Sequence, residues 1–287
     1  MSERSWLTAA GIRPRKRLGQ NFLLDPKIPA LIVERAGWDP AAPVLEIGPG
    51  GGALTHALLA AGHPVHCVEK DPALVTLLQE RFANEIEAGA LSVQEGDALA
   101  LADEDLTRTV RADPGARPWV AGNLPYPITT PLLVWCYAHA PRLAGAVVMV
   151  QREYGDRLLA RVDTRAYSSI TVWTRAHAEP RSLLRVGRSS FWPRPGVESV
   201  VLELRFPDPP PFSGDRAALE RILRAAFGQR RKMLQNTLAS GLAIDKTEAV
   251  DLLREAECDP AARAETLELN DFARLTAAWG ARFGSPE

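Results

Sequence analysis

The octet GNLPYPIT, residues 122–129, holds a neutral asparagine and a tyrosine next to two prolines. The apolar residues before it are typical of a buried strand, so we expect Asn123 to lie where that strand ends. Pro125 fixes its own φ, and Pro127 favours extended geometry at Tyr126. A side-chain amide holds a ligand by hydrogen bonds without acting as a strong base, and a tyrosine ring offers a flat stacking face. Taken alone, Asn123 could equally be a turn residue at a strand end.

A glycine-rich turn lies between a predicted strand and a predicted helix in VLEIGPGGGALTHALL, residues 44–59. Its glycines let the backbone approach a ligand closely, and the helix N-terminus offers unpaired N–H groups. The next strand ends in Glu69, about 20 residues after Gly48, where an acid can accept from ribose hydroxyls. The third strand brings Asp97 to the same edge, where a carboxylate can accept from an adenine amino group. The pattern predicts an adenosine-containing cofactor but leaves open nicotinamide dinucleotide or S-adenosylmethionine, a mere tight turn, and a helix N-cap at Asp97.

The order of four motifs resembles a known class of enzymes. EIGPG, a strand-end glutamate, GDA and GNLPY follow one another as in the amino-methyltransferases that use S-adenosylmethionine, and dehydrogenases have no use for Asn-x-Pro-Tyr at this strand end. Further segments resemble the ribosomal RNA adenine N6-dimethyltransferases, most closely the small-subunit family. These segments are RKRLGQNFL (15–23), FWPRPGVESVV (191–201) and AFGQRRKMLQNTL (226–238). The resemblance spans residues 15 to about 280, with the motifs in the family's order.

The resemblance implies catalytic roles for Asn123, Leu124, Tyr126 and Phe191. The exocyclic nitrogen of adenine is a poor nucleophile because its lone pair is delocalised into the ring. Acceptance of its N–H bonds by the Asn123 side-chain oxygen and the Leu124 carbonyl would draw it toward tetrahedral geometry, which is catalysis by positioning. Tyr126 would stack on the base, which is worth about 1–3 kcal/mol. Phe191 matches the family position that packs on the target base, and an ordinary core aromatic is the alternative.

The resemblance also implies S-adenosylmethionine as the cofactor. No metal is expected. An N-terminal Gln-Asn-Phe-Leu segment closes over the cofactor in the family. The predicted cofactor contacts are Asn21, Leu23, Gly48, Glu69, Asp97 and Asn123.

Two departures from the family pattern accompany the match. Pro127 stands where asparagine is common, which removes a backbone N–H near the site. Met233 and Gln235 replace the more usual threonine and basic residue, which removes one positive charge from the expected RNA face. Neither departure touches the proposed reacting atoms.

Two basic clusters stand out in a chain whose formal net charge is −1. RPRKR (13–17) and RILRAAFGQRRK (221–232) contain no carboxylate, whereas residues 85–105 are rich in acids. A charge run is often only a solvated face, but two such clusters in a nearly neutral chain favour surfaces for a polyanion. The predicted RNA-binding residues are Arg15, Lys16, Arg17, Arg230, Arg231 and Lys232.

Length and composition are those of a globular protein with one large and one smaller domain. The chain has 287 residues, of which 46% are hydrophobic and 24% charged. Its three cysteines are widely spaced, with no CxxC and no histidine at metal spacing, so we expect buried thiols in a reducing compartment. No apolar run approaches the roughly 18 residues of a membrane span, and the N-terminus lacks a signal-peptide core. We therefore expect a cytoplasmic protein with no membrane partner.

Short apolar runs alternate with helical patterns up to the proline-rich stretch PDPPPFSGD, residues 207–215. This alternation predicts an α/β fold with an open parallel sheet that an antiparallel strand closes. The resemblance implies that this is the Rossmann-like, seven-stranded methyltransferase sheet, parallel with one antiparallel strand. Residues 168–180, like 182–186 and 199–206, are interpreted as strands. Four helical patterns follow the proline-rich stretch and predict a small all-α C-terminal domain. The expected domains are a catalytic domain with its basic N-terminal segment, residues 1–208, and an RNA-binding domain, residues 209–287.

The function that the resemblance implies is methyl transfer to adenosine N6 in a hairpin loop of small-subunit (16S) ribosomal RNA. The expected product is N6,N6-dimethyladenosine on two adjacent adenosines, made late in subunit biogenesis, by a monomer that acts on a pre-assembled small subunit. One alternative is a resistance-type methyltransferase of the large subunit. Others are a ribosome-assembly factor without activity and, more remotely, a dinucleotide oxidoreductase.

Overall fold

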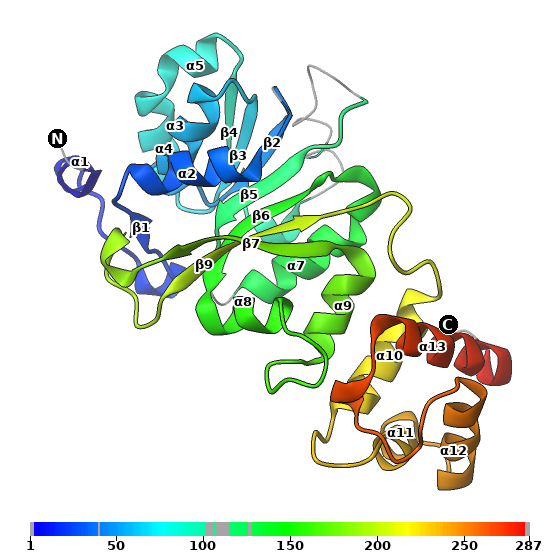
Figure 1. Ribbon diagram of the computed structural model, residues 1–287. Coiled ribbons are helices and arrows are strands. Elements are labelled where there is room, and N and C mark those ends of the chain that lie inside the picture. Colours follow the sequence, from blue (N-terminus) through cyan, green and yellow to red (C-terminus); the bar gives the residue numbers. More distant parts are fainter. Residues whose placement is uncertain (1–2, 40, 102–105, 107–114, 126–127, 285–287) are drawn as a thin grey trace. The chain divides into compact units, whose positions relative to one another are not determined.

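A seven-stranded sheet is the frame that positions the predicted site residues (Figure 1). Side by side, its strands are β4 (Leu91–Glu95), β3 (Val65–Glu69), β2 (Val44–Ile47), β5 (Trp119–Asn123), β6 (Gly145–Gln151), β9 (Ser199–Arg205) and β7 (Glu179–Val186). The pairs from β4 to β6 are parallel, and β9 runs antiparallel to β6. The predicted mostly parallel sheet with one antiparallel strand is confirmed. The antiparallel strand does not close the sheet, however, since β9 lies between β6 and β7.

The computed structural model describes residues 3–39, 41–101, 106, 115–125 and 128–284. Contacts divide the chain into two units, Met1–Gly155 with Arg181–Phe206, and Asp156–Pro180 with Pro207–Glu287. Residues 156–180 therefore belong to the second unit. The expected boundary after residue 208 had placed them with the sheet. The reason is packing with the C-terminal helices, where the buried Tyr167 hydroxyl donates to the Leu267 carbonyl across 2.8 Å. The roles of the two domains stay predictions.

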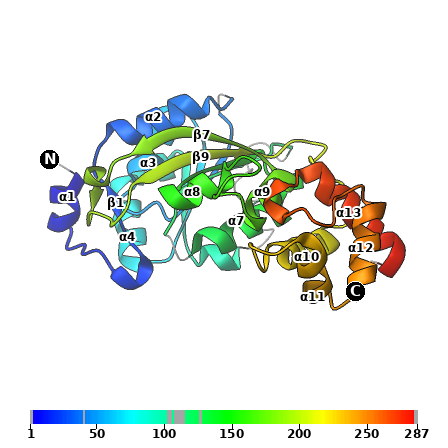
Figure 2. The same ribbon diagram turned by 60° about the horizontal axis from the view of Figure 1, so that its bottom comes forward.

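Helices that connect the parallel strands, or that lie just before or after them in the chain, cover both faces of the sheet. They are α2 (Lys27–Ala36), α3 (Ala53–Ala60), α4 (Pro72–Arg81), α5 (Ala83–Glu87), α7 (Thr129–Ala138) and α8 (Arg152–Leu158). Leu54 and Leu58 of α3 join Ile32 of α2 in one buried apolar core against the strands. On α8, Gly155 lies so close to Val200 that a Cβ would not fit without a shift. Figure 2 shows α2 and α8 on opposite sides of the sheet.

The strand register decides which side chains share a face at the carboxyl edge. Glu46 of β2 pairs with Cys67 of β3 and with Ala121 of β5. In-register neighbours in a parallel sheet point to the same face, and so does every second residue along each strand. Glu69 and Asn123 each lie two residues beyond one of these positions. The register therefore brings the two predicted site residues to the same face and the same edge.

Residues 169–177 correct one prediction, since they form helix α9 (Ser169–His177) and not a strand. The β-branched residues in this stretch suggested a strand. A capping box overrides that propensity, because the Ser168 side chain receives the N3 backbone N–H and Thr171 bonds back to the Ser168 N–H. Val172 and Ala176, one helical turn apart, are fully buried in the core of the second unit.

The predicted C-terminal helices are confirmed as α10 (Arg216–Phe227), α11 (Leu234–Leu242), α12 (Lys246–Glu255) and α13 (Leu269–Phe283). Asp215 caps α10 through the Ala218 N–H, and Asp245 with Glu248 forms a capping box on α12. Within the described ranges, no helix is long and apolar enough to cross a membrane. All three cysteines are buried free thiols, as expected.

The chain before α2 adds three short elements to the first unit: α1 (Glu3–Ala9), the 3-10 helix η1 (Lys16–Leu18) and β1 (Phe22–Leu23). β1 pairs antiparallel with β8 (Phe191–Trp192), which follows the 3-10 helix η5 (Arg188–Ser190). A further 3-10 helix, η2 (Ala98–Ala100), follows β4. Residues of α1, η1, β1, β8 and η2 line the cavity at the carboxyl edge of the sheet, where the predicted site lies.

Candidate active site

A cavity of about 210 Å³ lies at the carboxyl ends of β2 to β5. Its wall combines the ends of these four strands with the segment before α2. Every predicted catalytic and cofactor-binding residue in the described part of the chain lines it: Asn21, Leu23, Gly48, Glu69, Asp97, Asn123, Leu124 and Phe191. Tyr126, the remaining predicted catalytic residue, and Pro127 lie outside the described residues. The structure thus brings together side chains that are up to 170 positions apart.

The glycine-rich turn between β2 and α3 needs its glycines for both conformation and space. Gly48, Gly50 and Gly52 have φ values of 63°, 59° and 85°, in the left-handed region that favours glycine. A Cβ on Gly50 would lie 3.3 Å from the Phe22 ring, and one on Gly52 would lie 2.5 Å from the Phe82 ring. The loop therefore presents bare backbone to the cavity at the start of α3, where unpaired N–H groups attract polar ligands.

Glu69 ends β3 with a carboxylate that is already bound on both oxygens. Oε2 accepts from the Gly50 N–H at 3.2 Å, and Oε1 accepts from the Asp71 N–H at 2.9 Å. Burial raises the pKa of Glu69 because it penalises the charged form, and the two backbone hydrogen bonds oppose that rise. Each carboxylate oxygen has a further lone pair, so the group can still accept from a diol in the cavity.

Asp97 shows the N-cap geometry that was the alternative for this residue. Its Oδ1 accepts from the Leu99 N–H at 3.1 Å and so caps η2. Its Oδ2 accepts from the Lys70 ammonium at 2.6 Å, which lowers the pKa of Asp97. The capping role does not exclude a ligand, because the half-exposed carboxylate also lines the cavity. Its adenine contact stays a prediction.

Asn123 is held at the end of β5 in one amide orientation. Its Nδ2 donates to the backbone carbonyl of Asn21 at 2.8 Å. A carbonyl oxygen only accepts, so the amide nitrogen must face it, and Oδ1 is left as an acceptor to which no described residue donates. The next residue is anchored as well, since the Leu124 N–H donates to the Met149 carbonyl at 3.2 Å. Two neighbouring oxygens, Asn123 Oδ1 and the Leu124 carbonyl, thus belong to a firmly held strand end.

Phe191 has features of a core aromatic and also of a residue that could contact the target base, the two interpretations given to it. It is only 4% exposed and belongs to the same apolar core as Leu23 and Met149, as an ordinary core aromatic would. It also lines the cavity and pairs with Leu23 across the β1–β8 ladder. Its contact with a target base stays a prediction.

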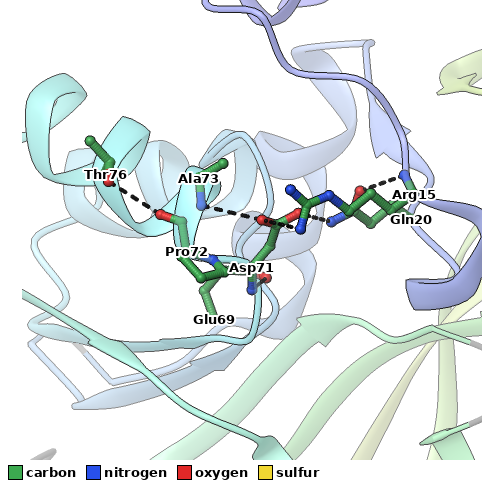
Figure 3. A network of polar contacts seen from close by, with 7 residues as sticks. All are labelled: Arg15, Gln20, Glu69, Asp71, Pro72, Ala73 and Thr76. Carbon is green, nitrogen blue, oxygen red and sulfur yellow. Dashed lines mark hydrogen bonds and ion pairs between the residues drawn. The ribbon is translucent and has the colours of Figure 1, made fainter.

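A polar network around Asp71 was missed by sequence reasoning (Figure 3). Asp71 is 3% exposed and receives the Arg15 guanidinium at 3.0 Å and the Gln20 Nε2 at 3.0 Å. It also caps α4 through the Ala73 N–H, and an Asp-Pro helix start is the one signal in the sequence that points to it. Arg15, predicted to bind RNA, therefore has its guanidinium engaged within the fold.

The other predicted RNA-binding residues differ in their exposure and in whether their side chains are already hydrogen-bonded within the protein. Arg17 is exposed and lines the cavity, and the side chain of Lys16 lies outside the described part. In the second unit, Arg230 donates to the carbonyls of Arg165 at 2.7 Å and Tyr167 at 3.3 Å. The exposed Arg231 and Lys232 have no ion pair within the described residues.

The cavity fits S-adenosylmethionine by the chemistry of its donor and acceptor groups. Glu69 offers acceptors for a ribose diol, and Asp97 lies at the edge where an amino group can reach it. Bare glycine backbone and the buried side chains of Leu23 and Ile47 complete the wall. Among the residues that the structure describes, no cluster of three histidine, cysteine, aspartate or glutamate side chains could hold a metal ion.

Comparison with known proteins points to ribosomal RNA methyltransferases over most of the chain. A family model described as ribosomal RNA adenine dimethylase matches residues 11–276. "Ribosomal RNA small subunit methyltransferase A" of Desulfitobacterium hafniense is 37% identical over 268 residues, 93% of each chain. The solved structure of a dimethyladenosine transferase from Plasmodium falciparum is 26% identical, with a TM-score of 0.77, and the match covers 91% of this chain and 98% of that one. The structure of the 23S rRNA methyltransferase ErmE is 27% identical, with a TM-score of 0.66, over 90% and 98% of the two chains. The glycine-rich turn, the strand-end acids and the GNLPY segment thus occur in a chain that belongs to the ribosomal RNA adenine dimethylase family.

Proposed function

We propose that this protein transfers methyl groups from S-adenosylmethionine to N6 of adenosines in small-subunit ribosomal RNA. The product is N6,N6-dimethyladenosine on two adjacent adenosines of a 16S hairpin loop. The observation that carries the proposal is the orientation of Asn123, whose Nδ2 is bound to the Asn21 carbonyl so that Oδ1 is the acceptor left for a substrate. An acceptor pair at this strand end suits an exocyclic amine, which carries two N–H donors.

The chain's own residues act by positioning. Asn123 Oδ1 and the Leu124 carbonyl accept the two N6–H bonds and pull the nitrogen toward tetrahedral geometry, so that its lone pair is no longer delocalised into the ring. Bound S-adenosylmethionine supplies an electrophilic sulfonium methyl group. Once alkylated, the nitrogen is strongly acidic and loses its proton without a strong base, which suits a neutral amide. Tyr126 and Phe191 hold the base by stacking and packing.

The second methylation uses the same groups with one hydrogen bond fewer. After the first transfer, N6 retains one N–H, so one of the two acceptors suffices. The first methyl group must then face an apolar wall, and Leu23, Met149 and Phe191 line this cavity. A neutral amide beside a methyl group costs less desolvation than a carboxylate would.

The proposed partner is a pre-assembled small subunit, met late in biogenesis by a monomer in the cytoplasm. A loop target is favoured because extruding an unpaired adenine costs only a few kcal/mol or less. Exposed Arg231 and Lys232 offer phosphate contacts on the second unit. Glu69 and Asp97, together with Asn21, Leu23, Gly48 and Asn123, are the proposed cofactor contacts.

The large-subunit alternative keeps one observation in its favour, the structural similarity to a 23S rRNA methyltransferase across 90% of the chain. One experiment separates the two. The protein is given labelled S-adenosylmethionine with naked 16S RNA, assembled small subunits lacking the modification, or 23S RNA, and nucleosides are identified by mass spectrometry. We expect N6,N6-dimethyladenosine from the small subunit; labelling of 23S RNA alone, or no labelling, would refute the proposal.

A further inference from the structure

The residues from Arg15 to Leu24, called here the N-terminal strap, are fixed at both ends. At the first end Asp71 accepts from the Arg15 guanidinium at 3.0 Å and from Gln20 Nε2 at 3.0 Å. Gln20 closes the link by accepting from the backbone N–H of Arg15 at 2.8 Å. Figure 3 shows these side chains converging on the start of α4. We call this group, Arg15, Gln20 and Asp71, the latch.

The other end of the strap is held by main-chain pairing. Phe22 and Leu23 form a two-residue ladder with Trp192 and Phe191, and the Leu24 N–H donates to the Ser190 carbonyl at 2.7 Å. Asn21 lies between the latch and this ladder. Its backbone carbonyl is the group that receives Asn123 Nδ2.

Asn123 thus depends on a carbonyl that is supplied from 102 positions away in the chain. If the strap shifts, the carbonyl leaves the Asn123 amide, and no other hydrogen bond from the described residues then decides which way Oδ1 and Nδ2 point. A flipped amide would present a donor to a substrate amine that also donates. The orientation that favours the reaction is therefore set by the strap and not by β5 alone.

We propose that Asp71 and Gln20 are positioning residues for methyl transfer, which act by holding the strap so that the Asn21 carbonyl orients the Asn123 amide. The inference rests on the proposed function of Asn123 and adds to it the residues that set its geometry. Asp71 does not line the cavity, and Gln20, which does, has its side-chain amide bonded to Asp71 and to the Arg15 backbone. Their effect passes through the strap to the acceptor at the end of β5.

A purely structural role for Asp71 is the competing explanation, because its Oδ1 also caps α4 through the Ala73 N–H. Asparagine caps helices as well as aspartate does, so Asp71→Asn keeps the cap. The amide nitrogen that this substitution introduces would replace Oδ2 and face Gln20 Nε2, which leaves two donors opposed in a largely buried site. The backbone N–H of residue 71 that donates to Glu69 is unchanged by the substitution.

The sharpest test is an exchange of the two polar groups. Gln20→Glu alone places two carboxylates together, and Asp71→Asn alone opposes two donors. The double variant restores the link, because the carboxylate introduced at position 20 can accept from both the Arg15 N–H and the amide introduced at position 71. Thr76→Val is the matched control, since it removes a hydrogen bond to the Pro72 carbonyl on the same helix without touching the latch.

Transfer is measured over a series of small-subunit concentrations with S-adenosylmethionine saturating, which gives kcat and KM, at a temperature where circular dichroism shows every variant folded. We expect each single variant to lose about ten- to a hundredfold in kcat, the cost of a small misplacement, with KM for RNA unchanged. The double variant should return to within about threefold of wild type, because the paired changes are strongly non-additive. Thr76→Val should keep the wild-type kcat.

A measurement without turnover separates this inference from the proposed function. The side-chain amide ¹H–¹⁵N signals of Asn123, assigned from their loss in Asn123→Ala, report the bond to Asn21. They should shift in each single variant and return in the double variant, even if the wild type methylated no RNA. Unchanged amide signals, single variants with normal kcat, or a raised KM in place of a lowered kcat would overturn the inference. Failure of the double variant to recover would do so too.

Discussion

The backbone N–H of Gly50 donates to the Oε2 atom of Glu69 across 3.2 Å, so the cofactor turn and the end of the next strand are tied to each other. The same carboxylate holds the Asp71 N–H, and the Asp71 side chain in turn holds the N-terminal strap. A change at Glu69 therefore reaches the turn on one side and the strap on the other.

Replacing Glu69 should weaken S-adenosylmethionine binding. Glu69→Ala removes the acceptor for the ribose hydroxyls, and hydrogen bonds to a charged group are worth about 1.5–3 kcal/mol, or roughly ten- to a hundredfold in affinity. Calorimetric titration measures the effect. Thr76→Val, on the helix that follows, is the control and should bind normally. An unaltered dissociation constant in Glu69→Ala would count against the proposed cofactor site.

Cofactor affinity should also depend on pH through the same residue. Burial raises the pKa of Glu69 above its ordinary 4.5, so protonation begins at a higher pH than for an exposed glutamate. The ionised form is the better acceptor, so affinity should fall as the pH drops through that raised pKa. Glu69→Gln should bind more weakly at neutral pH and lose this dependence. A wild-type affinity that stays flat down to pH 4.5 would contradict the assignment.

Glu46 should make the fold less stable at high pH. Burial raises its pKa to about 7, against hydrogen bonds from Thr55 and Cys67 that lower it. Because the pKa of Glu46 is higher in the folded state than its unfolded value of 4.5, protonation of Glu46 stabilises the fold. This stabilisation is complete below pH 4.5 and is lost as the pH rises to about 7. The loss is on the order of 3 kcal/mol. In chemical denaturation, Glu46→Gln should flatten this dependence and be the more stable form at about pH 8, above the raised pKa; parallel curves for the two proteins would contradict it.

Much of the fold followed from local patterns, and its exceptions have local causes. Alternating apolar runs predicted the sheet, and apolar residues at helical spacing predicted the C-terminal helices. Both patterns could be recognised because they involve only residues close together in the sequence. Residues 169–177 misled the prediction because β-branched side chains outweighed the capping box at Ser168. The position of β9 inside the sheet depends on strand order, which periodicity does not encode.

The site divides in the same way. Glu69, Asp97 and Asn123 could be predicted because parallel strands end at one edge, so their sequence positions already imply proximity. The latch could not be, since Gln20 and Asp71 are 51 positions apart and nothing in the recognised segment RKRLGQNFL points to Asp71 as the partner of Gln20. Arg15 shows why a basic run in the sequence does not tell which side chains are available to bind RNA. The sequence of the run does not reveal that Arg15 forms an ion pair with the buried carboxylate of Asp71.

The RNA surface of the second unit should depend on Arg231 and Lys232 more than on Arg230. Reversing the first two to glutamate should weaken RNA binding, reduce the salt slope by about 2 and leave the melting temperature unchanged. Arg230→Ala should instead lower the melting temperature, because it removes the hydrogen bonds to the carbonyls of Arg165 and Tyr167. Filter binding across a salt series and thermal melting report the two effects. A salt-insensitive complex would refute an electrostatic RNA surface here.

Asn123→Ala should bind S-adenosylmethionine nearly as well as wild type yet lose methyl transfer. The lost acceptor matters chiefly in the transition state, so kcat should fall while the cofactor dissociation constant stays close to normal. The wild type should carry small-subunit RNA to N6,N6-dimethyladenosine, measured by nucleoside mass spectrometry after exhaustive reaction. Asn123→Asp is a second variant of interest, because a carboxylate cannot donate to the Asn21 carbonyl and would be repelled by it. It should therefore transfer poorly although it still offers oxygen acceptors. Full activity of Asn123→Asp, an end product that stops at the monomethyl form, or methyl groups on cytosine or guanine would show that this strand end is not a dimethylating adenine site.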